Sequence, residues 1–374
     1  MKGYGGTSHS ARMWKIVAAA SLAIALLLCV MEINGNYIKR MLTDLVNPAV
    51  AQAPQIPSPQ PETPQPPSPL PSQEVDPEAV MRADPICFMG MGKHPGLEET
   101  DDPKAFGNMV SRSDICGIEI LDDLSLADEN AKDVSEAGNG KVLAWVEQGD
   151  AGPVLCIAGN RGVIAPRDCS MLFAAYTNAE YIHLNGALKT DNTTNMYGMF
   201  AHCSSLKELD LSSLNTSACT TMGEMLGKCR ALIRVNLDGF QTENVESMLG
   251  MFTECEKLER LDLSGFRTDR VTTMRAMFYD CKSLEQLDVS SFDTARVTDM
   301  AHMFSECRSL KQLDLSSFDT VQATDMTWMF HNCVSLKILD ITDFDTTNVT
   351  AREKMFEGCR SDLVKLHDET MFED

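Results

Sequence analysis

The sequence repeats itself every 26 residues, and this period limits the possible folds more than any other feature. Met-Phe pairs begin at Met199, Met251, Met277, Met303, Met329 and Met355, and Met225-Leu226 is a softened copy. A cysteine stands four residues after each of these methionines, at Cys203, Cys229, Cys255, Cys281, Cys307, Cys333 and Cys359. Self-similarity at a fixed period of about 20 to 50 residues is typical of solenoids, in which each unit stacks on the next.

One unit, from Val297 to Phe318, predicts the structure of them all. Its first apolar residues follow the spacing i, i+3, i+4 and i+7: Met300, Met303, Phe304 and Cys307. This spacing places four side chains on one face of a helix, so we expect a short helix there. Leu313 and Leu315 then flank Asp314, an alternation that predicts a short strand with the leucines inside and the aspartate outside. The expected fold class is therefore an α/β repeat solenoid.

The units are expected to fold only as a stack. A single unit buries too few apolar side chains to offset the entropy lost when its backbone is ordered, whereas stacked coils cover each other's open ends. A degenerate first unit carries Leu172-Phe173 in place of Met-Phe and Ile182-x-Leu184 as its strand, one residue out of step. A last unit begins at residues 363–366. The solenoid is therefore predicted to span residues 171–374.

The region before the repeats divides into four parts. Residues 1–15 are a polar segment expected in the cytoplasm, and residues 16–35 contain an apolar run that predicts a membrane anchor or a signal segment. An uncleaved anchor is favoured over a cleaved signal, which places the rest of the chain on the outer face of the membrane. Residues 36–80 form a proline-rich linker. Residues 81–170 are expected to form a small β-rich cap on the first coil, with strands at 115–121, 142–146 and 154–157.

The composition excludes some classes of function. A formal net charge of -22 argues against nucleic-acid binding, which needs a basic surface, and for a well solvated, self-repelling surface; it leaves a basic or cationic partner open. The histidines and cysteines show no metal-binding spacing. No nucleophile, base and orienting group can be assembled, so we expect no catalytic residue, cofactor or metal.

Two rows of the repeat invite a structural interpretation. The cysteine row is interpreted as buried thiols that pack like small apolar side chains, and a ladder of disulfides is the alternative. A threonine row is present in every unit, and its hydroxyls are expected to pair with backbone groups of the neighbouring coil. Its members are Thr190, Thr216, Thr242, Thr268, Thr294, Thr320 and Thr346.

The motif Met-Phe-x-x-Cys-x-x-Leu-x-x-Leu-Asp-Leu-Ser-x-Phe-Asp-Thr, seen from Met303 to Thr320, resembles the repeat of BspA-like bacterial surface proteins, a divergent leucine-rich-repeat family. The flank at residues 142–146 is similar to what precedes such arrays. This resemblance implies a leucine-rich-repeat-like solenoid, surface display and binding to proteins, including host matrix proteins. Phenylalanine stands where ordinary leucine-rich repeats carry asparagine, as at Phe318, so their curvature is not expected to transfer.

We therefore expect a non-catalytic surface protein that binds a protein partner, as an adhesin or binding module, on a host, a matrix or a neighbouring cell. The alternatives are a spacer protein without a specific ligand and an enzyme with its site in residues 81–170. The candidate binding face is the outward row between the two inward strand residues: Asp210, Asp262, Asp288, Asp314 and Asp340, with Asn236 in the same row. The competing interpretation is that this row only keeps the sheet soluble.

Overall fold

The computed structural model describes residues 109–360 and 364–366. The predicted anchor at 16–35, the linker at 36–80 and the first part of the cap lie outside these residues. Within the described part, no helix is both long and apolar enough to cross a membrane.

The N-terminal part of the described chain is a five-stranded sheet in the order β2-β3-β4-β1-β6. The strands are β1 (Gly117–Leu121), β2 (Lys132–Asp133), β3 (Val142–Gly149), β4 (Gly152–Gly159) and β6 (Tyr181–His183). Short 3-10 turns, η2 (Arg112–Asp114) and η3 (Leu124–Leu126), flank β1. β3 and β4 form an antiparallel hairpin, and β1 runs parallel to both β4 and β6. The strands predicted at 115–121, 142–146 and 154–157 are thus present as β1, β3 and β4.

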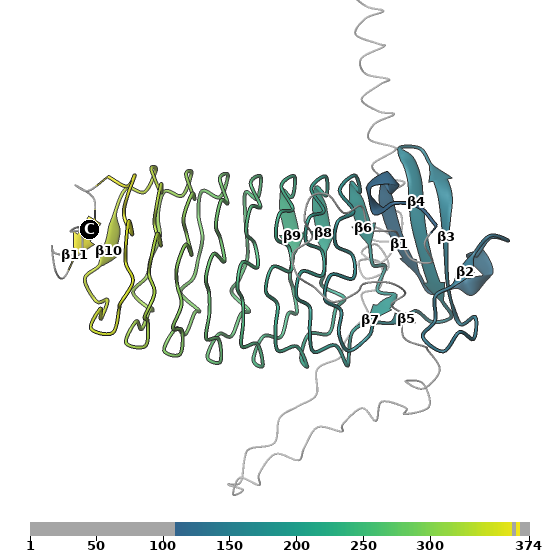
Figure 1. Cartoon of the computed structure of the whole chain (residues 1–374), viewed down its shortest axis with the longest axis horizontal. Helices are drawn as coiled ribbons and strands as arrows, with labels where there is room; N and C mark the ends of the chain where they lie inside the picture. Colours follow the sequence, from purple (N-terminus) through teal and green to yellow (C-terminus); the bar gives the residue numbers. More distant parts are fainter. Residues whose placement is uncertain (1–108, 361–363, 367–374) are drawn as a thin grey trace, which may run out of the picture. The chain divides into compact units, whose positions relative to one another are not determined.

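This sheet joins directly to the repeats, because β6 belongs to the first coil (Figure 1). The buried Arg112 guanidinium strengthens the junction by donating hydrogen bonds to the carbonyls of Met171 and Ala174. The same guanidinium lies over the ring of Tyr176, 4.9 Å from its centroid. The β-rich region therefore contacts the open end of the first coil through a buried charged group that is hydrogen-bonded to its backbone.

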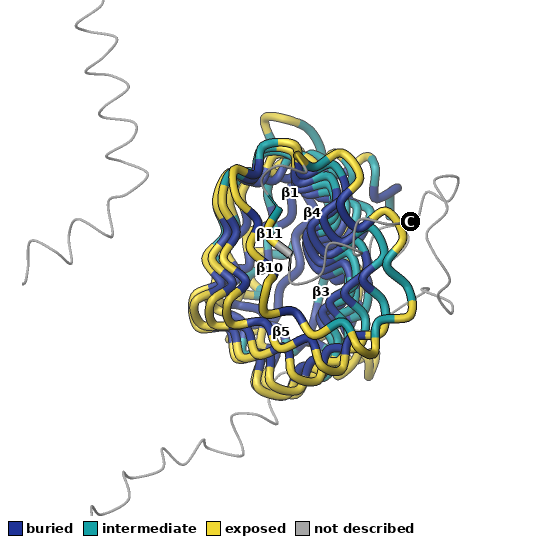
Figure 2. The backbone as a smooth tube through the Cα atoms, turned by 90° about the vertical axis from the view of Figure 1, so that its left-hand side faces the viewer, coloured by how far each residue is buried: buried dark blue, intermediate teal, exposed yellow. Residues whose placement is uncertain are grey.

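The repeats form successive coils, and each coil lies beside the next along one direction (Figure 1). Their short strands are β7 (Leu188–Lys189), which pairs with β5 (Val163–Ile164), β8 (Glu208–Asp210), β9 (Arg234–Asn236), β10 (Leu339–Ile341) and β11 (Val364–Leu366). β8 pairs with β9 and β10 pairs with β11, both in parallel. Seen along the stack, buried residues occupy the same places in successive coils (Figure 2).

The segment expected to be a helix, Met300 to Cys307, is not one. Its amides alternate between two kinds of partner. Those of Met303 and Cys307 donate to the third residue before them, at 3.1 and 3.2 Å. Those of Met300 and Phe304 donate to carbonyls of the next coil, both at 2.9 Å. In an α-helix the amide of Phe304 would donate to the carbonyl of Met300 and that of Cys307 to the carbonyl of Met303, so the prediction of a short helix per coil is wrong for the described coils.

Left-handed backbone explains how turns reproduce helical spacing. His302 and Glu306 have φ angles of 59° and 64°, and the equivalent pairs in other coils are also positive. Each such residue ends one tight turn and starts another, which brings Met300, Phe304 and Cys307 inward again. We call this part of each coil the Met-Phe side; its amides form a ladder of hydrogen bonds between coils. Isolated parallel bridges such as Thr273↔Asp299 and Asp299↔Asp325 lie at its start.

The core consists of the predicted apolar rows. Met300, Met303, Phe304 and Cys307 are fully buried. Phe252, Phe278, Phe304, Phe330 and Phe356 stack one above another, with ring centroids 5.7 to 5.9 Å apart. The first coil is one residue out of step, as expected: Asp168 pairs with Asn195, which is 27 positions away, and Asn195 pairs with Thr221, which is 26 positions away.

The cysteines of the repeat are free thiols, and each donates its S–H to a carbonyl of the preceding coil. Cys307 Sγ lies 3.1 Å from the carbonyl oxygen of Phe278, and the same contact recurs from Cys203 to Cys359. Burial raises the pKa of Cys307 to about 12. A cysteine at this row therefore fills a small apolar space and also gives an inward-facing carbonyl a partner.

The threonine row pairs with backbone groups, as predicted. The Thr268 hydroxyl donates to the carbonyl of Asp293 at 2.8 Å and accepts from the amide of Asp293, also at 2.8 Å. Thr216 and Thr242 bind Gln241 and Arg267 in the same two-way manner. Each buried hydroxyl thus links two coils at the bend that follows the strand.

Candidate functional site

The face of the array that carries the short strands is hollowed along its length. We call it the strand face. Three adjoining hollows, of about 690, 400 and 1030 Å³, run from the first coil to residue 314. The first two share Arg234 and Val235, and the last two share Arg260, Leu261 and Asp288. Together they form one feature, the strand-face groove.

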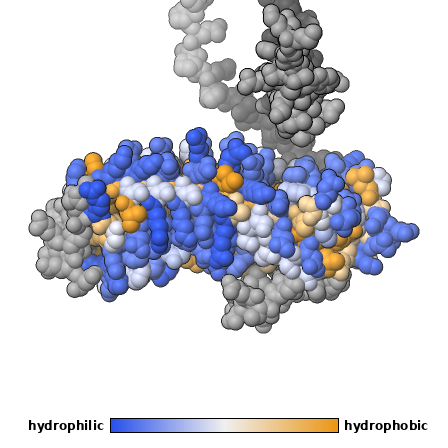
Figure 3. Space-filling model, turned by 90° about the horizontal axis from the view of Figure 1, so that it is seen from above, coloured by the Kyte–Doolittle hydropathy of each residue, from blue (hydrophilic) through white to orange (hydrophobic). Residues whose placement is uncertain are grey.

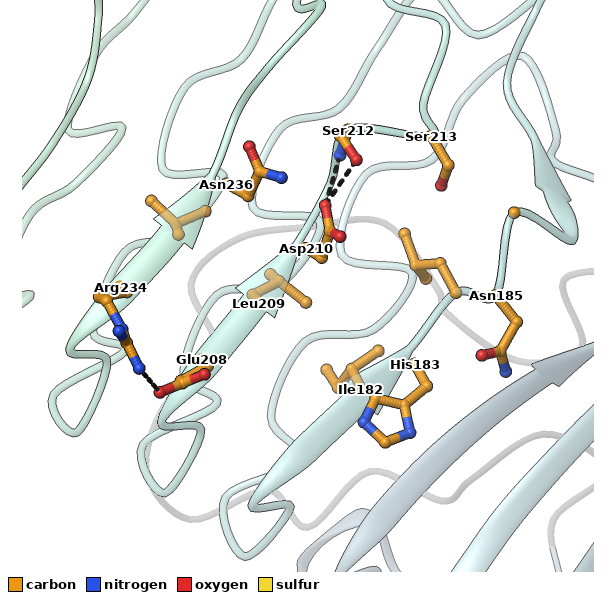
Figure 4. Close-up of a pocket in the computed structure, with 13 residues that line it drawn as sticks. Ile182, His183, Asn185, Glu208, Leu209, Asp210, Ser212, Ser213, Arg234 and Asn236 are labelled. Atoms are coloured by element: carbon orange, nitrogen blue, oxygen red, sulfur yellow. Dashed lines mark hydrogen bonds and ion pairs between the residues drawn. The ribbon is translucent and has the colours of Figure 1, made fainter. Parts of the chain in front are cut away.

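The first hollow is shown in Figure 4. Side chains from β6, β8 and β9 line it, and Arg234 reaches across to form an ion pair with Glu208 of the previous coil. Leu209 lies behind these charged groups, and Asp210 turns toward Ser212. The hollow therefore has an apolar floor between charged borders.

A histidine at the N-terminal end of this hollow contacts the β-rich region. His183 Nδ1 lies 2.8 Å from Glu119 Oε1, and the hydrogen bond with Glu119 raises the pKa of His183 despite its partial burial. Burial acts to raise the pKa of Glu119, but hydrogen bonds with His183 and Asn185 outweigh it and lower that pKa. The pair therefore favours a charged imidazole beside a charged carboxylate.

Four members of the predicted acidic row form one border of the groove: Asp210, Asp262, Asp288 and Asp314. All five aspartates are exposed, as the alternation predicted: Asp210, Asp262, Asp288, Asp314 and Asp340. Each of them also has a local task that sequence reasoning missed, because its Oδ1 accepts the amide N–H two residues ahead. Asp288 and Asp314 receive this bond from Ser290 and Ser316, at 3.0 Å in both cases. Asn236 makes the same bond to Asp238, which explains why an amide can occupy the row.

These hydrogen bonds lower the pKa of Asp262, Asp288, Asp314 and Asp340. The backbone amide and side chain of Ser264 lower the pKa of Asp262, and the side chain and amide of Ser290 lower that of Asp288. The neighbouring Asp288 acts in the opposite direction on Asp262, as like charges should, but its effect is smaller. Neighbouring carboxylates of the row therefore repel each other, but for Asp262 this effect is smaller than that of the hydrogen bonds.

The opposite border and the floor complete the groove. The border consists of Glu208, Arg234, Arg260, Gln286 and Gln312, which are equivalent positions of successive coils. The floor contains the leucine row, of which Leu261 is partly exposed. This border is visible in the sequence, because every position two residues before the acidic row is polar from Glu208 to Gln312. Polar residues at these positions do not by themselves predict a groove.

The backbone of the central coils is open at this face. In the described chain, no hydrogen bond to a backbone carbonyl is found for the amides of Leu261, Leu263 and Val289. A single bridge, Gln286↔Gln312, joins the strand segments between β9 and β10. The strand face of these coils is therefore joined by fewer backbone hydrogen bonds than the Met-Phe side.

Potential metal ligands are not clustered at this face in the described residues. Among residues 109–360 and 364–366, no three His, Cys, Asp or Glu side chains lie close enough together to hold a metal ion. The acidic row repeats one carboxylate per coil, which suits a long charged surface better than a single cation.

Comparison with protein families identifies the repeats. The model of the family described as "Mycoplasma protein of unknown function, DUF285" matches residues 167–262 and 256–367, more than half of the 374 residues. The chain belongs to the DUF285 family. Searches of curated proteins and of solved structures found no match. The two DUF285 matches cover the coils and the whole strand-face groove, so the groove is built from the family's repeats.

Proposed function

We propose that this DUF285 protein is a non-catalytic cell-surface protein that binds a basic protein surface through the strand-face groove. The observation that carries the proposal is the groove itself, which joins exposed carboxylates of successive coils along one border. Complementary charge across such a surface would speed association and select the partner. The partner would relieve the repulsion within the acidic row.

The wider setting is part of the same proposal. The stacked coils support a solenoid related to leucine-rich repeats, with turns in place of the helix, and the resemblance to BspA-like proteins supports an adhesin that binds host, matrix or neighbouring-cell proteins. The apolar run at residues 16–35 supports attachment to the outer face of the membrane. Figure 3 shows that one long side of the array is mostly hydrophilic, as expected for a surface that stays in water between encounters.

A spacer without a specific ligand is the second candidate. It is favoured by the local bonds of the acidic row, because Asp288 and its equivalents already have a structural task at the turn. The two candidates differ in whether the negative charge of the acidic row is needed for partner binding. Asparagine at these positions keeps the Oδ1 acceptor, as Asn236 shows, and removes only the charge.

The test is a pull-down of purified matrix proteins on the immobilised full chain, compared with a variant that combines Asp262→Asn, Asp288→Asn and Asp314→Asn. The proposal predicts that the full chain retains a basic protein. The variant should bind this protein more weakly than the parent does, and the difference should be largest at low ionic strength, where screening is least. The variant should also be more stable than the parent at low salt. If the variant retains the same protein equally well at low salt, the row serves the turns and solubility alone.

A further inference from the structure

The last coils carry a surface unlike the rest of the strand face. We call it the C-terminal patch: Lys311, Val334, Lys337 and Arg360, which line a hollow of about 610 Å³, together with Ile338, which follows Lys337 in the chain. Val334 and Ile338 are 48% and 56% exposed, and they are two of the four large exposed hydrophobic residues in the described chain. The patch adjoins the C-terminal end of the strand-face groove, which also reaches residues 309–314.

The fold does not demand aliphatic side chains at these positions. One coil earlier, the equivalent of Val334 is Arg308 and the equivalent of Ile338 is Gln312. Two coils earlier the equivalents are Lys282 and Gln286, and both are polar as well. Because the other coils tolerate polar residues here, Val334 and Ile338 are not needed for stacking.

The patch also carries a positive charge where the central coils carry negative charges. Lys337 occupies the row held by Glu259 and Glu285 in the central coils, and no ion pair engages it in the part of the chain that the structure describes. Lys311 in the same row bonds to Glu285 at 2.6 Å, on the side toward the groove. Lys337 therefore offers its charge beside two exposed aliphatic groups.

We propose that the C-terminal patch is a second docking surface, which binds an acidic protein segment that carries aliphatic side chains. The positive charges complement the carboxylates of the segment, and Val334 and Ile338 bury its apolar groups. A short segment responds mainly to charges within a Debye length of about 8 Å, so Lys337 affects it more than the distant carboxylates that make up most of the net charge of -22. An extended anionic membrane would approach the acidic rest of the array as well, so a protein segment is the occupant that fits.

The test uses a short fluorescein-labelled peptide of Asp and Glu with two central Leu residues, and its leucine-free counterpart. Binding to the full chain is followed by fluorescence anisotropy at low and high salt. We expect Lys337→Gln to weaken binding about tenfold at low salt and less at high salt. Ile338→Thr should weaken binding about fivefold at both, and only for the leucine-containing peptide.

Matched control variants outside the patch distinguish a loss of binding from a loss of folding. Lys132→Gln removes an exposed lysine from β2, and Val321→Thr changes an aliphatic residue that is 43% exposed outside the patch; both should bind as the parent does. The variant with three asparagines in the acidic row should also bind as well as the parent, which separates this proposal from the proposed function. Equal binding by Lys337→Gln and the parent would overturn the proposal. So would Lys337-dependent binding to phosphatidylserine vesicles without binding to the peptide.

Discussion

The substitution Thr268→Val tests how the coils are joined. Valine has nearly the shape of threonine, so the change removes a hydroxyl without leaving a cavity. Thr268 is 1% exposed, and its hydroxyl makes two hydrogen bonds to the backbone of Asp293 in the next coil. Each bond contributes about 0.5 to 1.5 kcal/mol, so we expect a loss of about 1 to 3 kcal/mol in the free energy of unfolding.

Thr298→Val is the matched control. The Thr298 hydroxyl is exposed and makes one intercoil bond, to the carbonyl of Thr272 at 3.2 Å, which water can replace. We expect a loss below about 0.5 kcal/mol. Urea unfolding of the full chain, followed by circular dichroism, measures both variants, and an unchanged m-value shows that the same structure unfolds. If the two variants shift the midpoint equally, the threonine row does not join the coils.

Three further outcomes are expected. Iodoacetamide at pH 8.5 should label Cys359 in the native protein before the other repeat cysteines, because Cys359 is partly exposed and a hydrogen bond with the Cys333 thiol lowers its pKa. Mass spectrometry of the digest would show the order of labelling. Ala276→Gly should cost less stability than Ala295→Gly, or even stabilise, because Ala276 has a φ of 54° that disfavours a side chain; urea midpoints compare them. The stabilising pair of His183 and Glu119 should weaken as pH falls through the lowered pKa of Glu119 and as it rises through the raised pKa of His183. NMR titration would show Glu119→Gln returning the His183 pKa toward its ordinary value.

The period alone predicted which side chains are inside. The apolar rows, the threonine row and the slip in the first coil all follow from spacing, because every coil must present the same side chains to its neighbours. Spacing alone could not distinguish a helix from a series of tight turns. Positions i, i+3, i+4 and i+7 also meet when tight turns alternate with left-handed residues, and only the intercoil bonds of Met300 and Phe304 decide between the two.

The groove could be predicted only in part. Alternation placed the acidic row on the outside, and all its aspartates are exposed. The absence of backbone hydrogen bonds from the amides of Leu261 and Leu263 depends on how closely neighbouring coils approach at the strand face, which no local pattern encodes. The turn bonds of the aspartates could have been read from the motif Asp-x-Ser, since a carboxylate commonly accepts the amide two residues ahead.

Hydrogen exchange tests the central claim, that the strand-face groove is the binding surface, most directly. The full chain would be measured alone and saturated with the matrix protein that the pull-down retains. The amides of Leu261, Leu263 and Val289 should exchange faster than those of Met300 and Phe304 in the free protein, because no backbone carbonyl accepts from them. The account predicts that the partner slows the first group and leaves the second unchanged. Protection confined to the Met-Phe side or to the N-terminal sheet would contradict it.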